Sequence, residues 1–314
     1  MNKKPFLIIV LLLTVVSFLA GSRLAQKGEG KKILGSQPAT PTPEVNKEGS
    51  SKSYSFTPKK KSAKPEVKFF VMSFCPFGNQ AEAGLEPVYQ LLKDKVEWLP
   101  RYIFSPITQD TVDRCKGNCA YRVADDNAKK QCQQAIEQKQ LPQGMTVENC
   151  VQAYFPYKTQ EDCIQKECRT LKIGAYDSLH GQQEFNQDIR EICAYNLGNL
   201  EKWWKFVSMV NEKCSSTNAD TCWRLLAEQA GFDAEKIASC EKSQANSLAK
   251  KEVEETQKYN VSGSPTVYIN DTLYEGGRSP EDYKKAICLA FEEPPTECQT
   301  VLGKESAPSS GGCN

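Results

Sequence analysis

The chain has 314 residues, which is enough for one or two domains. Its 40 Lys and Arg balance 39 Asp and Glu, and a net charge of +1 gives no indication of a nucleic-acid partner or an acidic substrate. The 14 cysteines indicate an oxidising compartment, and a single histidine, His180, excludes a histidine-rich metal site.

The first 26 residues predict a signal for export. Lys3 and Lys4 precede an apolar run from Phe6 to Ala20, the pattern of a secretory signal peptide or a short signal anchor. The run is short for a full membrane span, but no clear small-x-small cleavage site follows it. We therefore expect either a single-pass anchor in the cell membrane or a cleaved signal and a secreted protein. In both cases the rest of the chain lies outside the cytoplasm.

Residues 27–64 form a linker rich in Gly, Ser, Lys and Pro. Such a composition cannot bury a core and predicts a flexible spacer.

The next elements alternate between strand and helix. Val67–Met72 predicts a strand, Asn79–Asp94 a helix that contains Pro87, and Val96–Phe104 a second strand. A long polar stretch with helical spacing follows, from about residue 105 to 260. Within it Asp233 has the position of a helix N-cap.

Two short strands and a helix end the pattern. The strands are expected at Pro265–Asn270 and Leu273–Glu275, and the helix opens with Ser279 as N-cap and Pro280 at its first position. Residues 293–314 are expected to be a disordered tail.

The chemistry centres on Cys75, which lies between the first strand and the first helix. At a helix N-terminus the unpaired amides and the helix dipole favour the thiolate, the nucleophile of disulfide exchange. The segments Phe74–Gly78 and Val261–Thr266 resemble the thioredoxin superfamily. The element order resembles its DsbA-like variant. That resemblance implies an α/β, thioredoxin-like domain over residues 65–292, with a large cysteine-rich helical insertion at about 105–260.

A third segment is similar to another family of this fold. Leu179–Glu184, followed by Cys193, resembles the His-Gly-x-x-Glu signature of the gamma-interferon-inducible lysosomal thiol reductases. Phe185 stands where that family has a cysteine. The similarity is therefore partial.

The resemblance also implies the shape of the site. The proline of that family that corresponds to Pro265 is cis. It lies against the active cysteine, where a substrate peptide binds. The expected groove is lined by Pro76, Phe77, Gly78, Ser264, Pro265 and Thr266. An ordinary proline at the start of a strand is the alternative.

The family motif is Cys-x-x-Cys, but here the fourth position is Gly78. Three hypotheses follow. Cys75 acts alone, with a small thiol or a second substrate thiol completing the exchange. Cys313 in the tail resolves the mixed disulfide. Or Cys75 is inert, and the fold serves as a redox-inactive binding or chaperone-like module.

The other cysteines form groups of even number along the chain. Disulfides within each group are expected, because each group has an even number of cysteines. The pairing within a group cannot be derived, since six cysteines alone allow 15 pairings. A zinc site in the first group is the alternative. The groups are Cys115, Cys119, Cys132, Cys150, Cys163 and Cys168; Cys193, Cys214, Cys222 and Cys240; and Cys288 with Cys298. In the first group, the spacings suit two facing helices joined by two bridges.

The sequence therefore predicts an extracytoplasmic thiol–disulfide oxidoreductase with Cys75 as its single catalytic cysteine. It needs no cofactor and no metal. Expected partners are cysteine-containing secreted or membrane proteins, with a small thiol or a membrane redox partner as further candidates. His180 is either a general base or a packing residue, and Trp203, Trp204 and Trp223 are expected in the core.

Overall fold

The computed structural model describes residues 55–305. The expected signal segment, most of the linker and Cys313 lie outside this range. The described chain falls into two units: residues 55–109 with 172–305, and residues 110–171. Within residues 55–305, none of the helices has both the length and the apolar composition that crossing a membrane requires.

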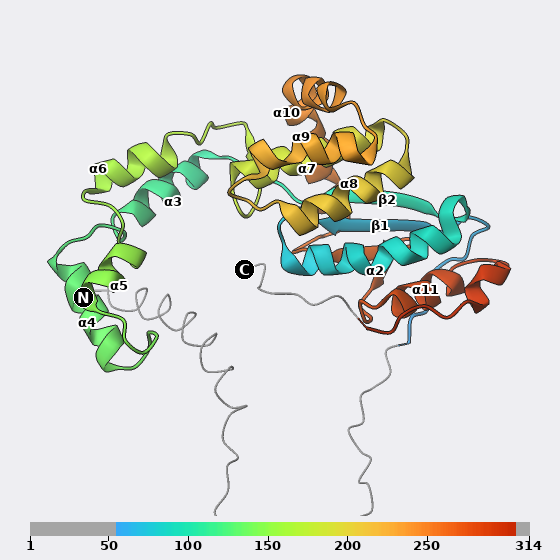
Figure 1. Ribbon diagram of the computed structural model, residues 1–314, viewed down its shortest axis with the longest axis horizontal. Coiled ribbons are helices and arrows are strands. Elements are labelled where there is room, and N and C mark those ends of the chain that lie inside the picture. Colours follow the sequence, from blue (N-terminus) through green and yellow to red (C-terminus); the bar gives the residue numbers. More distant parts are fainter. Residues whose placement is uncertain (1–54, 306–314) are drawn as a thin grey trace, which may run out of the picture. The chain divides into compact units, whose positions relative to one another are not determined.

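The larger unit is built on a four-stranded sheet in the order β2-β1-β5-β6. Figure 1 shows its neighbouring strands β1 and β2 beside α2. β1 pairs with β2 in parallel, so the chain must cross over between them, and α2 makes that crossover. The pairs β1–β5 and β5–β6 are antiparallel. The strands are β1 (Glu66–Val71), β2 (Glu97–Tyr102), β5 (Thr266–Ile269) and β6 (Thr272–Tyr274).

Helices complete this unit, together with a small second sheet of β3 (Ser105–Pro106) and β4 (Tyr176–Asp177). The helical elements are α2 (Pro76–Leu92), η1 (Lys93–Lys95), α7 (Gln182–Asn196), α8 (Leu200–Lys213), α9 (Ala219–Ala230), α10 (Ala234–Lys258), α11 (Pro280–Leu289) and η3 (Thr296–Gln299). The expected insertion of 105–260 thus has two parts, because α7–α10 belong to the thioredoxin-like unit and only 110–171 forms a unit of its own.

Aromatic side chains fill the core between the sheet and the helices. Phe69 of β1 stacks on Trp204 of α8 with ring centroids 5.6 Å apart, and Trp203 packs edge-on against both rings. Trp203, Trp204 and Trp223 are at most 2% exposed, which confirms their expected place in the core. Burial of such large side chains is the main favourable contribution to folding here.

The helix caps form as the sequence predicts. Ser279 accepts a hydrogen bond from the N–H of Asp282 at the start of α11, and Asp233 accepts from Glu235 and Lys236 at the start of α10. Each cap satisfies donors that a helix leaves unpaired in its first turn.

The chain after α11 is ordered where a disordered tail was expected. Cys298 in η3 is bonded to Cys288 of α11. Beyond η3, Leu302 N–H donates to the Glu281 carboxylate at 2.8 Å, and Glu281 N–H donates to the Gly303 carbonyl at 3.0 Å. These contacts across α11 hold residues 293–305, so the prediction of disorder was wrong for this stretch.

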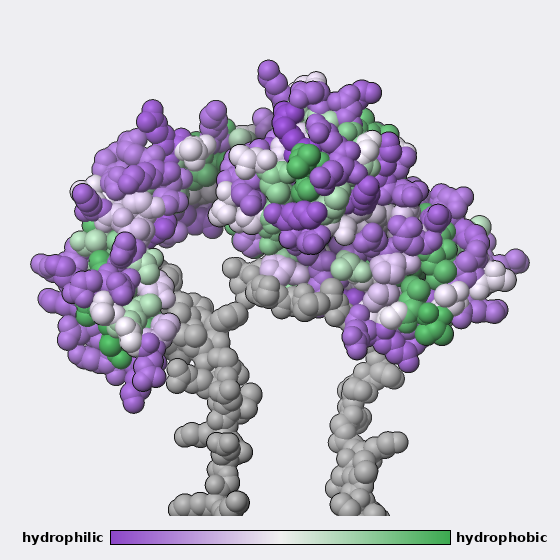
Figure 2. Space-filling model, in the orientation of Figure 1, coloured by the Kyte–Doolittle hydropathy of each residue, from purple (hydrophilic) through white to green (hydrophobic). Residues whose placement is uncertain are grey.

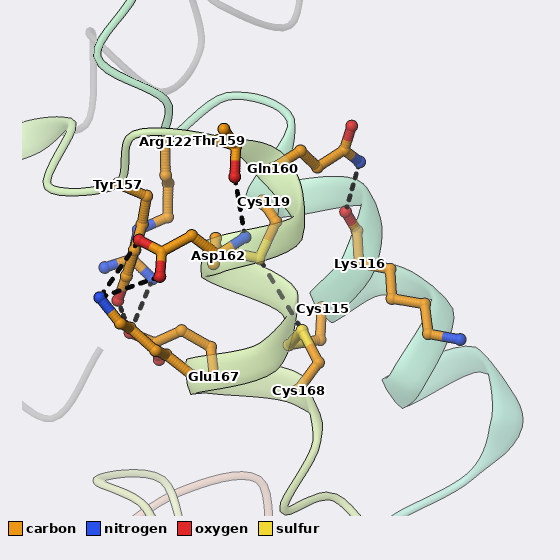
Figure 3. Close-up of a disulfide and its surroundings, with 12 residues drawn as sticks. Cys115, Lys116, Cys119, Arg122, Tyr157, Thr159, Gln160, Asp162, Glu167 and Cys168 are labelled. Carbon is orange, nitrogen blue, oxygen red and sulfur yellow. Dashed lines mark hydrogen bonds and ion pairs between the residues drawn. A yellow bond between two sulfur atoms is a disulfide. The ribbon is translucent and has the colours of Figure 1, made fainter.

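The smaller unit is held by disulfides. Its elements are α3 (Gln109–Cys119, whose first residue belongs to the larger unit), α4 (Asp126–Glu137), α5 (Val147–Tyr154), α6 (Gln160–Cys163) and the π-helical turn η2 (Ile164–Cys168). Figure 3 shows α3 facing α6 and η2, with Cys115, Cys119 and Cys168 between them. Two bridges, Cys115–Cys168 and Cys119–Cys163, join these elements. This is the pair of facing helices with two bridges that the spacings suggest.

The third bridge of this unit, Cys132–Cys150, joins α4 to α5. The apolar cluster around the first two bridges is small: four residues are buried in it, and three of these are cysteines. Tyr157 is the fourth. Its hydroxyl donates to Glu167, and the Arg122 guanidinium lies over its ring at 5.0 Å. With so little buried apolar surface, this unit depends on its disulfides.

Figure 2 shows a largely hydrophilic face, with small separate hydrophobic areas, one of them over α11. Scattered apolar side chains are normal on a protein surface and by themselves indicate no binding site.

Candidate thiol–disulfide exchange site

Cys75 is the N-cap residue of α2. Its N–H donates to the Met72 carbonyl at 3.1 Å, which turns the chain out of β1, and Pro76 occupies the first helical position. The Cys75 Sγ accepts the Gly78 N–H at 3.4 Å. A sulfur in this position receives an unpaired helix donor and the positive end of the helix dipole, both of which stabilise a thiolate.

The loop before β5 brings Ser264 and Pro265 to Cys75. In the β1–β5 pairing Thr266 lies opposite Phe70, so the residues before Thr266 extend past the end of β1, where Cys75 follows. The Ser264–Pro265 peptide bond is cis. The Ser264 carbonyl oxygen lies 3.6 Å from the Cys75 Sγ. Segments about 190 residues apart in sequence thus meet at one site.

Gly78 and Ser264 fit each other closely. A Cβ added at Gly78 would lie 2.7 Å from the Ser264 Oγ and 3.3 Å from the Met72 carbonyl oxygen. The Ser264 Oγ is buried and has no hydrogen-bond partner among the described residues. The hydroxyl therefore fills the space that a side chain at position 78 would need.

The other expected lining residues lie around this contact. Phe77 is half-buried, and the Arg278 guanidinium lies over its ring at 5.1 Å. Pro76 is also half-buried. Thr266 donates its hydroxyl to the Gly263 carbonyl at 2.7 Å, a bond within its own loop.

Cys75 is fully buried and takes part in a disulfide. The remaining cysteines of the described range pair with one another, so none of them is its partner. Each pair lies within one of the three expected groups, and bonded sulfurs leave no thiolate for the alternative zinc site. The pairs are Cys115–Cys168, Cys119–Cys163, Cys132–Cys150, Cys193–Cys240, Cys214–Cys222 and Cys288–Cys298.

Buried carboxyl groups lie next to the segment that leads into Cys75. Asp188 accepts the Ser73 N–H at 2.8 Å and Glu184 accepts the Phe74 N–H at 3.0 Å. Both side chains project from α7, and both residues are 0% exposed. Glu191, one turn further along α7, accepts the Tyr102 hydroxyl at 2.7 Å.

Burial controls the protonation of this cluster. It raises the pKa of Asp188 well above its usual range, and the Glu184 charge adds to the effect. Burial also raises the pKa of Glu191 to about 7 and that of Glu82, on α2, well above its usual range. The charged form of a carboxylate is disfavoured away from water, so these groups retain protons that exposed acids lose.

Sequence reasoning did not identify Glu82, Asp188 and Glu191 as site residues. Acidic side chains at a spacing of three or four on a helix usually indicate a solvated face. Here α7 is buried along most of its length, and its Asp188 accepts the Ser73 N–H just before Cys75. The available signal was the run of buried apolar residues on the same helix, Phe185, Ile189 and Ile192.

His180 is a partner of this cluster. Its ring Nδ1 lies 2.7 Å from one Glu184 carboxylate oxygen, and its backbone N–H donates to the other oxygen at 2.8 Å. These contacts give His180 a hydrogen-bonding role beside the site, while its role as a general base stays a prediction.

Comparison with known proteins agrees with this geometry. The family profile described as Thioredoxin matches residues 182–288. Among curated proteins, Vacuolar-sorting receptor 5 of Arabidopsis thaliana is 26% identical over 185 residues, which cover 49% of this chain and 30% of the receptor. Vacuolar-sorting receptor 1 of Pisum sativum is 26% identical over 181 residues, 48% of this chain and 29% of the receptor. The chain thus spans less than a third of the length of these relatives.

Solved structures of disulfide oxidoreductases are also similar. The reduced DsbG of Mycobacterium tuberculosis has a TM-score of 0.41 and 15% identity, covering 77% of this chain and 88% of its own. The probable DsbA oxidoreductase of Streptomyces coelicolor has a TM-score of 0.40 and 16% identity, covering 79% and 100%.

The sheet order, Cys75 at the start of α2 and the cis Pro265 beside it define a thioredoxin-fold protein. Helices α7–α10 lie between β2 and β5, as expected for the DsbA-like variant of that fold, which confirms the expected resemblance and fold class. Such a fold and site support thiol–disulfide oxidoreductase chemistry in general. The partial similarity to the gamma-interferon-inducible lysosomal thiol reductases stays a prediction.

Proposed function

We propose that this protein is an extracytoplasmic thiol–disulfide oxidoreductase that acts on cysteine-containing secreted or membrane proteins through Cys75. The observation that carries the proposal is the position of the Cys75 Sγ. It accepts a helix N–H from Gly78 and lies 3.6 Å from the Ser264 carbonyl, beside the cis Pro265. No cofactor is required, because sulfur atoms alone carry the electrons in this exchange.

The exchange takes two displacement steps. In the disulfide-bonded state of Cys75, a substrate thiolate attacks the Cys75 sulfur, a mixed disulfide forms, and the former partner of Cys75 leaves as a thiolate. A second substrate thiolate then attacks the substrate sulfur of the mixed disulfide, and Cys75 leaves as a thiolate. The substrate is oxidised by two electrons and the protein disulfide is reduced. The same steps in reverse reduce a substrate.

Cys313 is our candidate for the second thiol of the protein. Of the 14 cysteines, 12 form the six described pairs and one is Cys75, so Cys313 is the remaining one. An outside thiol that completes the exchange in place of Cys313 is the alternative.

The segment from Gly303 to Cys313 is long enough to reach Cys75 at the N-terminus of α2. Gly303 is tied to the start of α11 by its bond from Glu281, and Arg278, just before α11, lies over Phe77 next to Cys75. The ten residues from Gly303 to Cys313 extend to about 35 Å at most. The whole of α2, with 17 residues, is about 26 Å long. A cysteine at position 313 can therefore reach the N-terminus of α2.

Export from the cytoplasm is part of the proposal. Six disulfides in the described range are typical of a protein that folds in an oxidising compartment. The signal pattern in residues 1–26 supports the same placement, either anchored in the membrane or secreted.

The test is to trap the substrate. The full chain with Cys313→Ser, oxidised with a small disulfide in the presence of a reduced protein with a single thiol, should accumulate a mixed disulfide through Cys75, because no second thiol is present to resolve it. Cys75→Ser in the same background is the matched control and should trap nothing. Mass mapping of the parent under non-reducing conditions should find Cys75 joined to Cys313. If the Cys75→Ser variant exchanged disulfides as fast as the parent protein, the proposal would be refuted.

A redox-inactive binding module is the second candidate. It is favoured by the full burial of the Cys75 side chain. The matched relatives are named as receptors, so the same groove is a candidate site for binding a protein without exchange. A Cys75 disulfide that resists mild reductant, together with peptide binding unchanged by Cys75→Ser, would favour this candidate.

A further inference from the structure

The segment Ser73–Phe74 connects β1 to Cys75, and carboxylates of α7 bind its backbone. The Ser73 N–H donates to the Asp188 Oδ1 at 2.8 Å, and the Ser73 hydroxyl donates to the same oxygen at 2.5 Å. The Phe74 N–H donates to the Glu184 Oε1 at 3.0 Å. The two N–H groups that precede Cys75 are thus both bound by side chains of one helix.

The two carboxylates are themselves held in place. Ser178 bridges them, since its hydroxyl oxygen lies 2.8 Å from the Glu184 Oε2 and 3.1 Å from the Asp188 Oδ2. The His180 N–H donates to the Glu184 Oε2, and the His180 ring contacts the Oε1. Residues four apart on a helix share a face, which brings Glu184 and Asp188 together.

Burying two neighbouring acids is unfavourable unless their oxygens are satisfied by donors. Both residues are 0% exposed, and each carboxylate has contacts on both of its oxygens. A fold that requires only a filled core would place apolar side chains here at lower cost.

We propose that Glu184 and Asp188 are positioning residues for Cys75. By fixing the backbone of Ser73 and Phe74, they hold the Cys75 sulfur between the Gly78 N–H and the Ser264 carbonyl. The inference rests on the proposed function of Cys75 in disulfide exchange.

This role explains the spacing of the His-Gly-x-x-Glu segment. Gly181 has φ of +90°, a conformation that side chains disfavour, and α7 begins at the next residue. Glu184 therefore lies in the first turn of α7, where the His180 N–H and ring reach its carboxylate. Phe185, which stands in place of a cysteine, is 5% exposed and packs on Phe104 with ring centroids 5.1 Å apart.

The experiment measures the reactivity of Cys75 in Glu184→Gln. After mild reduction of the full chain, the Cys75 thiolate attacks a small aromatic disulfide, a mixed disulfide forms, and the aromatic thiolate that leaves is detected. We expect the second-order rate to fall about tenfold, because the amide cannot accept every bond that the carboxylate accepts. The pH at which the rate reaches half its maximum should also shift, since the sulfur has moved relative to its stabilising donor.

The matched control is Glu252→Gln. Glu252 is 4% exposed and accepts a backbone N–H, that of Tyr102 at 3.1 Å, but this N–H belongs to β2 and not to the segment before Cys75. It should lower the melting temperature without changing the pH profile of the rate. Equal rates and equal pH profiles for Glu184→Gln and Glu252→Gln would overturn the inference.

Two further measurements keep the result decisive. If Glu184→Gln does not fold, Ser178→Ala replaces it, because it removes the bridging hydroxyl and leaves both carboxylates; a loss of about threefold is expected, and an unchanged rate would overturn the inference. Amide hydrogen exchange of the peptide covering residues 73–75 should accelerate in the same variant. If the parent shows no exchange with protein substrates, the proposed function fails. Alkylation of reduced Cys75 still reports on its positioning.

Discussion

The contact between Gly78 and Ser264 predicts a strong interaction between two substitutions. In Gly78→Ala the new Cβ would lie 2.7 Å from the Ser264 Oγ, closer than such atoms approach in proteins. In Ser264→Ala that oxygen is absent, and the nearest atom to the new Cβ becomes the Met72 carbonyl oxygen at 3.3 Å. The second substitution should therefore relieve the first.

The expected magnitudes follow from three effects. Overpacking a close contact costs about 1–3 kcal/mol, and replacing glycine by alanine inside a helix returns up to about 1 kcal/mol. Gly78→Ala alone should lower the free energy of unfolding by about 1 kcal/mol. Ser264→Ala removes a buried hydroxyl that has no partner in the described structure, so it should be neutral or stabilising. In the double variant Gly78→Ala should be neutral or stabilising, which gives a coupling of about 1–3 kcal/mol.

Urea unfolding of the parent, both single variants and the double variant measures this coupling directly. All four proteins should be oxidised, so that the disulfides stay constant. If Gly78→Ala destabilises equally in both backgrounds, the Ser264 hydroxyl is not the obstacle and the Met72 carbonyl is. A cysteine side chain at position 78 would meet the same Ser264 hydroxyl. Gly78→Cys should therefore create a working Cys-x-x-Cys motif only together with Ser264→Ala.

Three further outcomes are expected. Strong reductant should lower the melting temperature and expose residues 110–171 to protease before the thioredoxin-like unit. The reason is that disulfides such as Cys115–Cys168 stabilise the 110–171 unit in place of a large core. Resistance of residues 110–171 in limited proteolysis would contradict this. Because burial raises the pKa of Glu191 to about 7, the folded chain holds a proton that the unfolded chain loses near pH 4.5. Stability should therefore fall as the pH rises from about 5 to about 7, and Glu191→Gln should flatten that part of a urea-derived profile; an unchanged slope would refute it. After mild reduction, iodoacetamide at mildly acidic pH should label Cys75 first, which peptide mass mapping can check, because the helix N-terminus favours its thiolate.

The strands, the caps and the cysteine groups could be predicted from the sequence because each depends on local pattern. Ser279 and Pro280 mark a helix start by their own chemistry, and apolar runs such as Val67–Met72 indicate a buried strand without reference to the rest of the chain. The approach of Ser264 to Cys75 could be expected only from the resemblance to thioredoxin-like proteins, since nothing local links the two segments.

Long-range contacts limited the prediction elsewhere. The polar residues after Phe291 resemble a disordered tail, yet Glu281 of α11 accepts the Leu302 N–H and Lys284 of α11 donates to the Thr300 carbonyl. In the same way Asp188 has the composition of a surface residue. Its burial depends on Ser73 and Ser178, which lie 115 and 10 residues away in the sequence. Hydrogen-bond partners at such separations cannot be derived from a helical pattern.

The small sheet of β3 and β4 has a consequence for how this chain can vary. Ile107 N–H donates to the Ala175 carbonyl at 2.8 Å, and Gly174 N–H donates to the Ile107 carbonyl at 2.9 Å. The residues on either side of the 110–171 unit are therefore neighbours in space, as the two ends of a hairpin loop are. A short turn could join them without altering the path of any strand or helix of the thioredoxin-like unit. The 110–171 unit is in this sense an exchangeable cassette, free to change in length and surface while the geometry around Cys75 is kept.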